Sequence, residues 1–102
     1  MKKQNKMLNT STSVKKLSDL PNIGPAMLKD FKMLGINKPL DLKSADPLEL
    51  YNRLSQKTRA YQDPCVLDVF IAAVRFMNGD PAKPWWAYTE ERKKLFLNKK
   101  NK

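Results

Sequence analysis

One segment of the sequence, from Pro64 to Met77, is apolar around almost the whole circumference of a helix. Asp63 precedes its proline, and this pair is a typical helix start because Asp caps the first amides and proline tolerates the first helical position. A helix that is apolar on all sides must be buried, so the segment predicts a central helix surrounded by others. Asp68 and Arg75 interrupt it and share a face, which is either a polar seam between helices or, as is commoner, a solvent-exposed stripe.

The other apolar residues recur with the spacing of a helix and not with the alternation of a strand. The fold class is therefore expected to be all-α, a compact domain of four to five helices. The central helix is expected to end at Gly79. Before it we expect a first helix from Ser13 to Leu20, a second from Pro25 that Gly35 ends, one helical turn around Leu40 and Leu42, and a helix that Asp46 caps. After it we expect a loop from Asp80 to Tyr88 and a last helix that Thr89 caps.

Length and composition exclude several classes of protein. The chain has 102 residues, enough for one domain. It has no histidine and one cysteine, Cys65, which excludes an internal disulfide and a multi-cysteine zinc site and removes the commonest general base. Its longest apolar run, Val69 to Val74, is far shorter than the roughly 20 residues that cross a bilayer, and the basic N-terminus lacks the apolar stretch of a secretory signal. We expect a cytoplasmic binding protein that is not an enzyme, with no cofactor, metal or membrane.

The net charge of +10 is concentrated at the two ends of the chain. Residues 1–16 carry five lysines and residues 93–102 another five, with no acid in either stretch, whereas residues 17–92 carry ten basic and ten acidic side chains. Tails of this kind either attract nucleic-acid phosphates without sequence preference or only keep a protein in solution. The composition predicts three parts: a disordered basic tail (1–13), a single helical domain (14–97) and a basic tail (98–102).

A sharp turn, Pro21-Asn22-Ile23-Gly24, lies directly before a helix that begins at Pro25. Such a turn exposes several backbone N–H groups that point the same way, and the positive end of the helix dipole makes them an anion site. Gly24 has no side chain to keep a phosphate away. Ile23 is expected to anchor the turn in the core.

The stretch from Leu17 to Phe31 resembles a helix-hairpin-helix motif, whose hairpin amides bind nucleic-acid phosphates, usually without reading the bases. The resemblance implies that the N–H groups of Asn22, Gly24 and Ala26 are the donors and that Lys29 adds a charge on the same face. Asn22 stands where the motif usually has glycine, and Asn tolerates the left-handed backbone best after glycine. Its side chain either crowds a bound phosphate or binds it. Such hairpins also serve as simple joints between helices or bind protein.

Further residue blocks are Leu-Gly-Ile, Asp-Pro-x-x-Leu-Tyr, Gln-Asp-Pro-Cys-Val-Leu-Asp-Val-Phe and Pro-Trp-Trp. With the hairpin they cover about residues 17–93, and their order resembles a small bacterial family, the pathogenicity-locus helix-hairpin-helix family, for which a mitomycin-resistance-like label is also used. Hairpins of this kind often come in pairs, which implies a SAM-like, paired-hairpin architecture. The connector from Asp41 to Asp46 lies where the second hairpin is expected, and because it has no glycine we expect it to complete the fold without binding.

Two tryptophans, Trp85 and Trp86, stand in a proline-flanked loop before the last helix. If exposed, they could stack on unpaired bases or on a planar drug. If buried, they hold the loop and the last helix onto the core. The small size of the domain favours at least one of them in the core.

Cys65 falls at the second position of the central helix, where a helix N-terminus favours a reactive thiolate. Asp63 and Asp68 lie close in sequence and oppose it, and the chain has no histidine to act as a base. A lone cysteine is more commonly a small apolar side chain.

Three functions are compatible with these features. The first is a DNA-binding module, with an RNA-binding one as its variant, that holds phosphates through the hairpin amides and gains salt-sensitive affinity from its lysine tails. The second is a helical adaptor that binds protein, with the hairpin as architecture. The third, an enzyme or drug-binding factor that uses Cys65 or the tryptophans, is disfavoured because no catalytic pair of residues is present. The sequence leaves the oligomeric state open.

Overall fold

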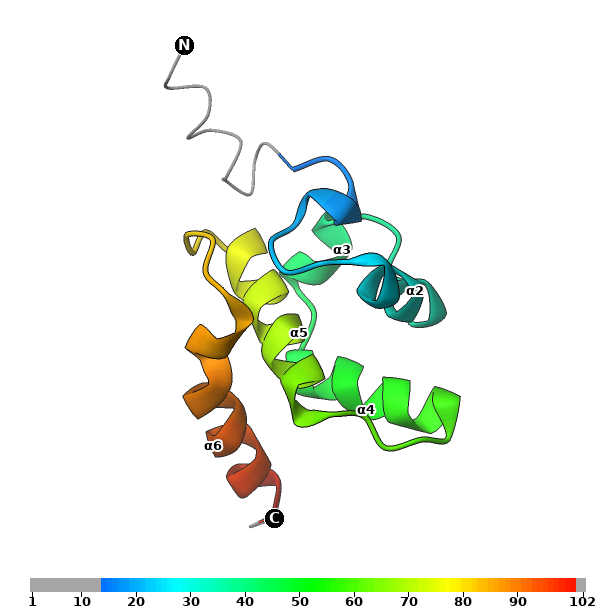
Figure 1. Ribbon diagram of the computed structural model, residues 1–102, viewed down its shortest axis with the longest axis vertical. Helices are drawn as coiled ribbons and strands as arrows, with labels where there is room; N and C mark the ends of the chain where they lie inside the picture. Colours follow the sequence, from blue (N-terminus) through cyan, green and yellow to red (C-terminus); the bar gives the residue numbers. More distant parts are fainter. Residues whose placement is uncertain (1–13, 101–102) are drawn as a thin grey trace.

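The apolar segment forms the central helix, as predicted. A computed structural model, which describes residues 14–100, shows α5 (Pro64–Met77) with the other elements arranged around it (Figure 1). Leu67, Phe70 and Ile71 of this helix have no measurable exposure. Its contacts reach α3, α4, α6 and the 3-10 helix that precedes α6.

The described residues contain helices and no strand, which confirms the all-α prediction. The core joins the apolar faces of nearly all these elements, and Phe31 packs against Phe70 with ring centroids 5.6 Å apart. The elements are, in chain order, the 3-10 helix η2 (Leu17–Asp19), α2 (Pro25–Met33), α3 (Leu40–Lys43), α4 (Pro47–Thr58), α5 (Pro64–Met77), the 3-10 helix η3 (Trp85–Tyr88) and α6 (Thr89–Lys100).

Prolines begin three of the helices, as the sequence predicts. Asp46 caps α4, because its carboxylate accepts a hydrogen bond of 3.0 Å from the amide of Leu48. At α5 the prediction is wrong in one respect: the helix begins at Pro64, but the side chain of Asp63 makes no capping hydrogen bond. Gly35 follows α2 with a φ of +80°, the left-handed conformation that glycine adopts at helix ends.

The predicted first helix from Ser13 to Leu20 is wrong over its described part. Only the single 3-10 turn η2 forms, and Lys16 before it is extended, with φ −123° and ψ 154°. Asp19 accepts hydrogen bonds from the amides of Lys16, at 3.1 Å, and Lys15, at 3.4 Å. These bonds hold the chain in a tight turn where a longer helix would extend it. Ser13, the predicted tail over 1–13 and residues 101–102 lie outside the described residues.

The last helix is not capped by Thr89, contrary to the prediction. A 3-10 helix, η3, precedes α6 without a break, and Thr89 already has helical angles of φ −60° and ψ −40°. Its hydroxyl donates a hydrogen bond of 2.7 Å to Oδ2 of Asp68. α6 continues to Lys100, past the boundary expected at residue 97.

Asp68 lies in a polar seam and not in a solvent-exposed stripe, which corrects the interpretation we favoured. Its side chain is 0% exposed, and Oδ1 accepts a hydrogen bond of 2.9 Å from Nε of Arg92, whose side chain is 17% exposed. Arg75, on the same face of α5, is half-exposed and pairs with Glu91. Two ion pairs and the Thr89 hydroxyl therefore bind α6 to α5.

Candidate nucleic-acid interface

Residues 20–24 join η2 to α2, and this turn is called the hairpin. Asn22 has a φ of +70°, so it adopts the left-handed conformation that the sequence requires of it. Ile23 is half-buried and packs against the core, as predicted. Gly24 is extended, with φ −109° and ψ −173°, and Pro25 occupies the first position of α2.

The N-terminus of α2 is open to solvent and is not capped. Gly24, Pro25 and Ala26 are exposed, and no side chain accepts a hydrogen bond there. Among residues 14–100, no backbone hydrogen bond uses the amides of Asn22, Gly24 or Ala26 as donors; the first amide bonded within this turn is that of Leu28, to the Gly24 carbonyl at 3.0 Å. A side chain added at Gly24 would meet no atom within 4 Å. The amides are therefore available to an anion from outside.

The side chain of Asn22 has a structural partner. Its Nδ2 donates a hydrogen bond of 2.8 Å to the carbonyl oxygen of Lys83, in the loop that follows α5. The side-chain amide of Asn22 therefore turns toward that loop. Its hydrogen bond joins the hairpin to a segment 61 positions further along the chain. The sequence contains no signal for this contact, because only the fold brings the two loops together.

Lys29 is exposed on α2, one turn after the hairpin amides. The pKa of the neighbouring Asp30 carboxyl is raised, because its partial burial raises the pKa more than the nearby Lys29 ammonium lowers it. Lys32, a further exposed cation, lies in the last turn of the same helix. The solvent-facing side of α2 therefore continues the positive end of the helix with lysine charges.

The second predicted hairpin joins α3 to α4 through residues 44–46. Here the carboxylate of Asp46 already accepts from the first turn of α4. An acidic cap at this helix start repels a phosphate and occupies a donor that the phosphate would need. That this connection completes the fold without binding stays a prediction.

The two tryptophans begin η3. Trp85 is half-buried and Trp86 is 62% exposed, so neither belongs to the buried core, in which we expected at least one of them. Their rings meet edge to face with centroids 5.4 Å apart. The buried aromatic side chain of this turn is Tyr88, at 5% exposure, and burial raises the pKa of its hydroxyl.

Cys65 lies at the second position of α5, half-buried and not in a disulfide. Within residues 14–100 no group of three His, Cys, Asp or Glu side chains could hold a metal ion. No helix of this part of the chain is both long and apolar enough to span a bilayer.

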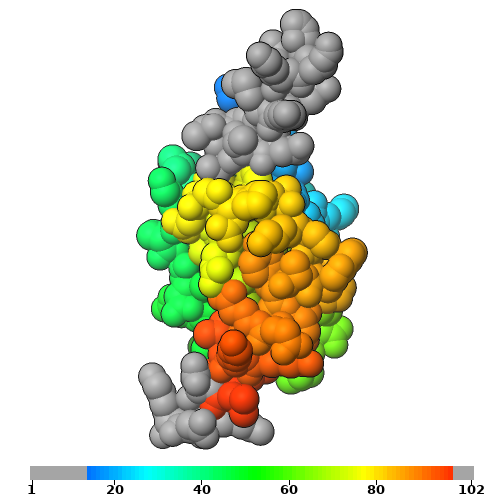
Figure 2. Space-filling model, turned by 90° about the vertical axis from the view of Figure 1, so that its left-hand side faces the viewer, coloured from blue at the N-terminus to red at the C-terminus, as the bar shows by residue number. Residues whose placement is uncertain are grey.

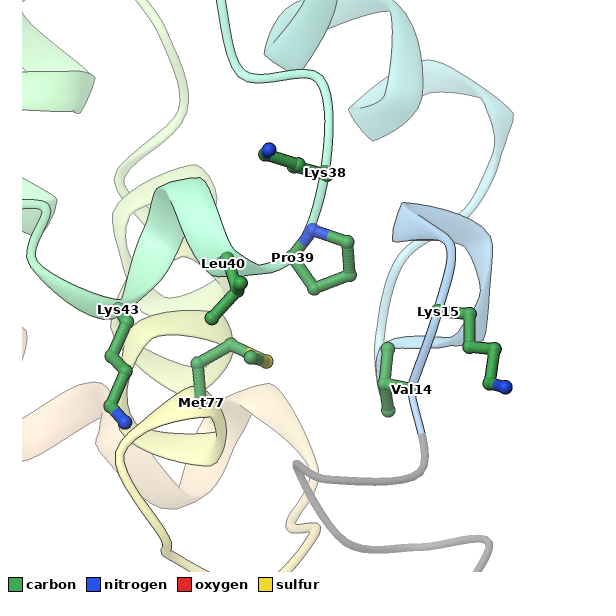
Figure 3. Close-up of a pocket in the computed structure, with 7 residues that line it drawn as sticks. All are labelled: Val14, Lys15, Lys38, Pro39, Leu40, Lys43 and Met77. Atoms are coloured by element: carbon green, nitrogen blue, oxygen red, sulfur yellow. The ribbon is translucent and has the colours of Figure 1, made fainter.

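A shallow cavity of about 370 Å³ lies away from the hairpin turn. Figure 3 shows the apolar side chains of Leu40 and Met77 close together on its wall, while the amines of its lysines point in different directions. Because the charges do not converge on one point, the cavity lacks the arrangement that binds a phosphate. Its lining residues are Val14, Lys15, Lys38, Pro39, Leu40, Lys43 and Met77.

Comparison with known proteins identifies relatives of the chain. Residues 10–94 match the model of a family described as Pathogenicity locus. Mitomycin resistance protein McrB of Streptomyces lavendulae is 42% identical over 86 residues, which cover 84% of this chain and 82% of that protein. No solved structure shows a significant match. Because the family model spans most of the chain, hairpin and α5 included, the chain belongs to the pathogenicity-locus family.

Proposed function

We propose that this protein is a DNA-binding module that holds backbone phosphates, without reading sequence, at the N-terminus of α2. The amides of Asn22, Gly24 and Ala26 are the donors, and Lys29 supplies a neighbouring charge. The lysine-rich ends of the chain add affinity that depends on salt. The proposal describes a binding protein and not an enzyme, and it places the protein in the cytoplasm, where bacterial DNA lies.

The observation that carries the proposal is the contrast between two helix starts. At α4 the Asp46 carboxylate accepts from the first turn. At α2 the helix start has no side-chain acceptor, no acid in its first turn and open space above Gly24. An uncapped helix start that is held rigidly at the surface matches the geometry and charge of a phosphate.

Gly24→Glu tests the proposal, with Gly24→Gln as its matched control. Both side chains fit the open space and the negative φ of this position, so both variants are expected to fold. Glutamate puts a negative charge where the phosphate is expected, whereas glutamine has the same size and no charge. Fluorescence anisotropy with a labelled blunt duplex should show Gly24→Glu binding about tenfold or more weakly than Gly24→Gln, because the carboxylate repels the phosphate.

The comparison is made on the full chain across a salt series, because the lysine-rich ends contribute at low salt. Circular dichroism checks that both variants keep the helical content of the wild type. If both variants bind the duplex as tightly as the wild type at every salt concentration, the hairpin is not the phosphate site.

A second candidate function is a helical protein-binding adaptor. The observation that favours it is the balance of ten basic and ten acidic residues over positions 17–92, which leaves the part from η2 to the start of α6 without net charge. In that case the hairpin is only a joint, and DNA binding comes from the ends of the chain alone. Binding as tight as that of the wild type by both Gly24 variants, with a steep dependence on salt, supports this candidate.

A further inference from the structure

Trp86 presents a large aromatic surface to solvent from a well-anchored turn. Its side chain is 62% exposed, and the edge-to-face contact with Trp85 restricts its ring. Tyr88 buries the other end of η3, and η3 packs against both α5 and α6. An exposed indole that is held in this way can receive a flat ring without losing much side-chain freedom.

The hydrogen bond from Asn22 to Lys83 places this turn beside the hairpin. Trp86 follows Lys83 by three residues, so the Cα atoms of these two residues are at most about 10 Å apart. In Figure 1 the hairpin turns beside the upper part of α5, and in Figure 2 light-blue atoms of the hairpin lie next to gold atoms of the loop that leaves this helix. The hairpin and the tryptophan turn therefore face solvent as neighbours.

The link between them also carries positive charge. Lys83 is exposed, and its ammonium lies 5.7 Å from the centroid of the Tyr88 ring. Lys83 therefore adds a positive charge to the loop that contacts the hairpin. Hydrogen-bond donors to phosphate, a lysine and an exposed aromatic ring are the groups with which proteins bind single-stranded nucleic acid.

We propose that the hairpin and Trp86 form one surface for DNA in which unpaired bases adjoin a duplex, such as a duplex end with a single-stranded overhang. The hairpin amides hold the phosphates, and Trp86 stacks on the first unpaired base. This inference rests on the proposed function, and it adds the form of DNA that the module prefers. Stacking tolerates any base because every base has a flat face, so the preference is for structure and not for sequence.

The test compares the full-length protein on two labelled ligands, a blunt duplex and the same duplex with a short oligothymidine overhang. The wild type should bind the overhang ligand about tenfold more tightly, the size of one base stacking on an aromatic side chain. Trp86→Ala should remove that preference and leave the affinity for the blunt duplex unchanged, and Trp86→Phe should keep part of it. Tyr61→Ala is the matched control, because Tyr61 is an exposed aromatic residue, at 80%, in the connection between α4 and α5.

Fluorescence gives a second readout. In a Trp85→Phe background, the emission comes from Trp86 alone, since the chain has two tryptophans. The overhang should quench it, and the blunt duplex should not.

The outcomes separate the inference from the proposed function. If Trp86→Ala keeps the overhang preference, or lowers the affinity for both ligands by the same factor, the stacking inference is wrong. A loss of affinity in Gly24→Glu relative to Gly24→Gln still supports the phosphate site in that case. If Gly24→Glu and Gly24→Gln both bind the two ligands as tightly as the wild type, the proposed function is wrong, and with it the combined surface.

Discussion

At the scale of single residues, Asp68 has the most consequential environment. A carboxylate without solvent exposure is stable only if its charge is paired and its oxygens accept hydrogen bonds. Here Arg92 pairs the charge, and the Thr89 hydroxyl donates a second hydrogen bond. The three groups come from α5 and α6, so the ion pair fixes how the last helix lies on the central one. A polar residue inside an apolar helix thus marks a helix–helix contact.

Removing this carboxylate should strongly destabilise the protein. Asp68→Ala leaves the largely buried Arg92 without its partner, and the expected loss in the free energy of unfolding is about 3–5 kcal/mol. Urea denaturation measures it. Glu90→Ala, which removes an exposed partner of Lys93, should cost less than about 1 kcal/mol. Similar losses in the two variants would show that the buried pair does not hold α6.

Asp41 should make stability depend on pH. Its carboxylate accepts hydrogen bonds from the backbone amides of Asn37, at 2.9 Å, and Lys38, at 3.2 Å. Both bonds lower the pKa of the Asp41 carboxyl, and the bond from Asn37 has the larger effect. Because the folded pKa lies below the unfolded value of about 3.9, the contribution is complete above that pH and is lost as the pH falls through the folded pKa. Wild type should be more stable than Asp41→Asn at pH 7, with the difference shrinking below about pH 4. A difference that does not change with pH in denaturation experiments would contradict this.

At the scale of elements, the hairpin is shaped by one residue with two tasks. Asn22 accepts a left-handed backbone and also ties the turn to the loop that follows α5. Glycine would perform only the first task. The amides of the hairpin are therefore held in place by tertiary contacts, and the η2 turn before them is too short to do so alone.

Substitutions at Asn22 should separate these tasks. Asn22→Gly keeps the backbone conformation and loses the hydrogen bond to Lys83, at a cost of about 0.5–1.5 kcal/mol. Asn22→Ala loses the hydrogen bond and also strains a φ of +70°, which adds about 1–2 kcal/mol. Thermal or urea denaturation should rank the stabilities as wild type, Asn22→Gly and Asn22→Ala, in decreasing order. If alanine is tolerated as well as glycine, the turn does not keep its left-handed residue in solution.

At the scale of the whole molecule, charge and shape are divided between different parts of the chain. The hairpin and η3 present the shaped surface, and the net positive charge lies in residues 1–16 and 93–102. The two contribute differently to binding, since counterion release depends on the number of charges and not on their arrangement.

Replacing Lys2, Lys3 and Lys6 with glutamine should therefore weaken binding to every DNA ligand by the same factor. The slope of log affinity against log salt should become shallower by up to roughly 0.9 for each lysine that contacts phosphate. The ratio between the overhang and blunt ligands should stay constant, because Trp86 sets it. Anisotropy titrations over a salt series measure both quantities, and a change in the ratio would show that the N-terminal lysines take part in ligand choice.

Much of the fold and part of the site could be predicted from residues whose effect is local. Prolines at helix starts, glycines after helix ends and the apolar segment from Pro64 to Met77 gave the helices that the structure shows. The same reasoning placed the hairpin and its left-handed residue. It failed at the first helix, where Asp19 closes a short turn, and at Thr89, whose hydroxyl bonds to another helix.

The sequence by itself determined the all-α class, the central helix and the place of the hairpin, because backbone preference and apolar periodicity act over a few residues. Only the tertiary structure decided that Asp68 is buried against Arg92, that Asn22 binds the carbonyl of Lys83 and that Trp86 faces solvent beside the hairpin turn. These are contacts between residues 24 or 61 positions apart, or the exposure that such contacts leave. Their partners meet only when the helices pack, so no local pattern could reveal them.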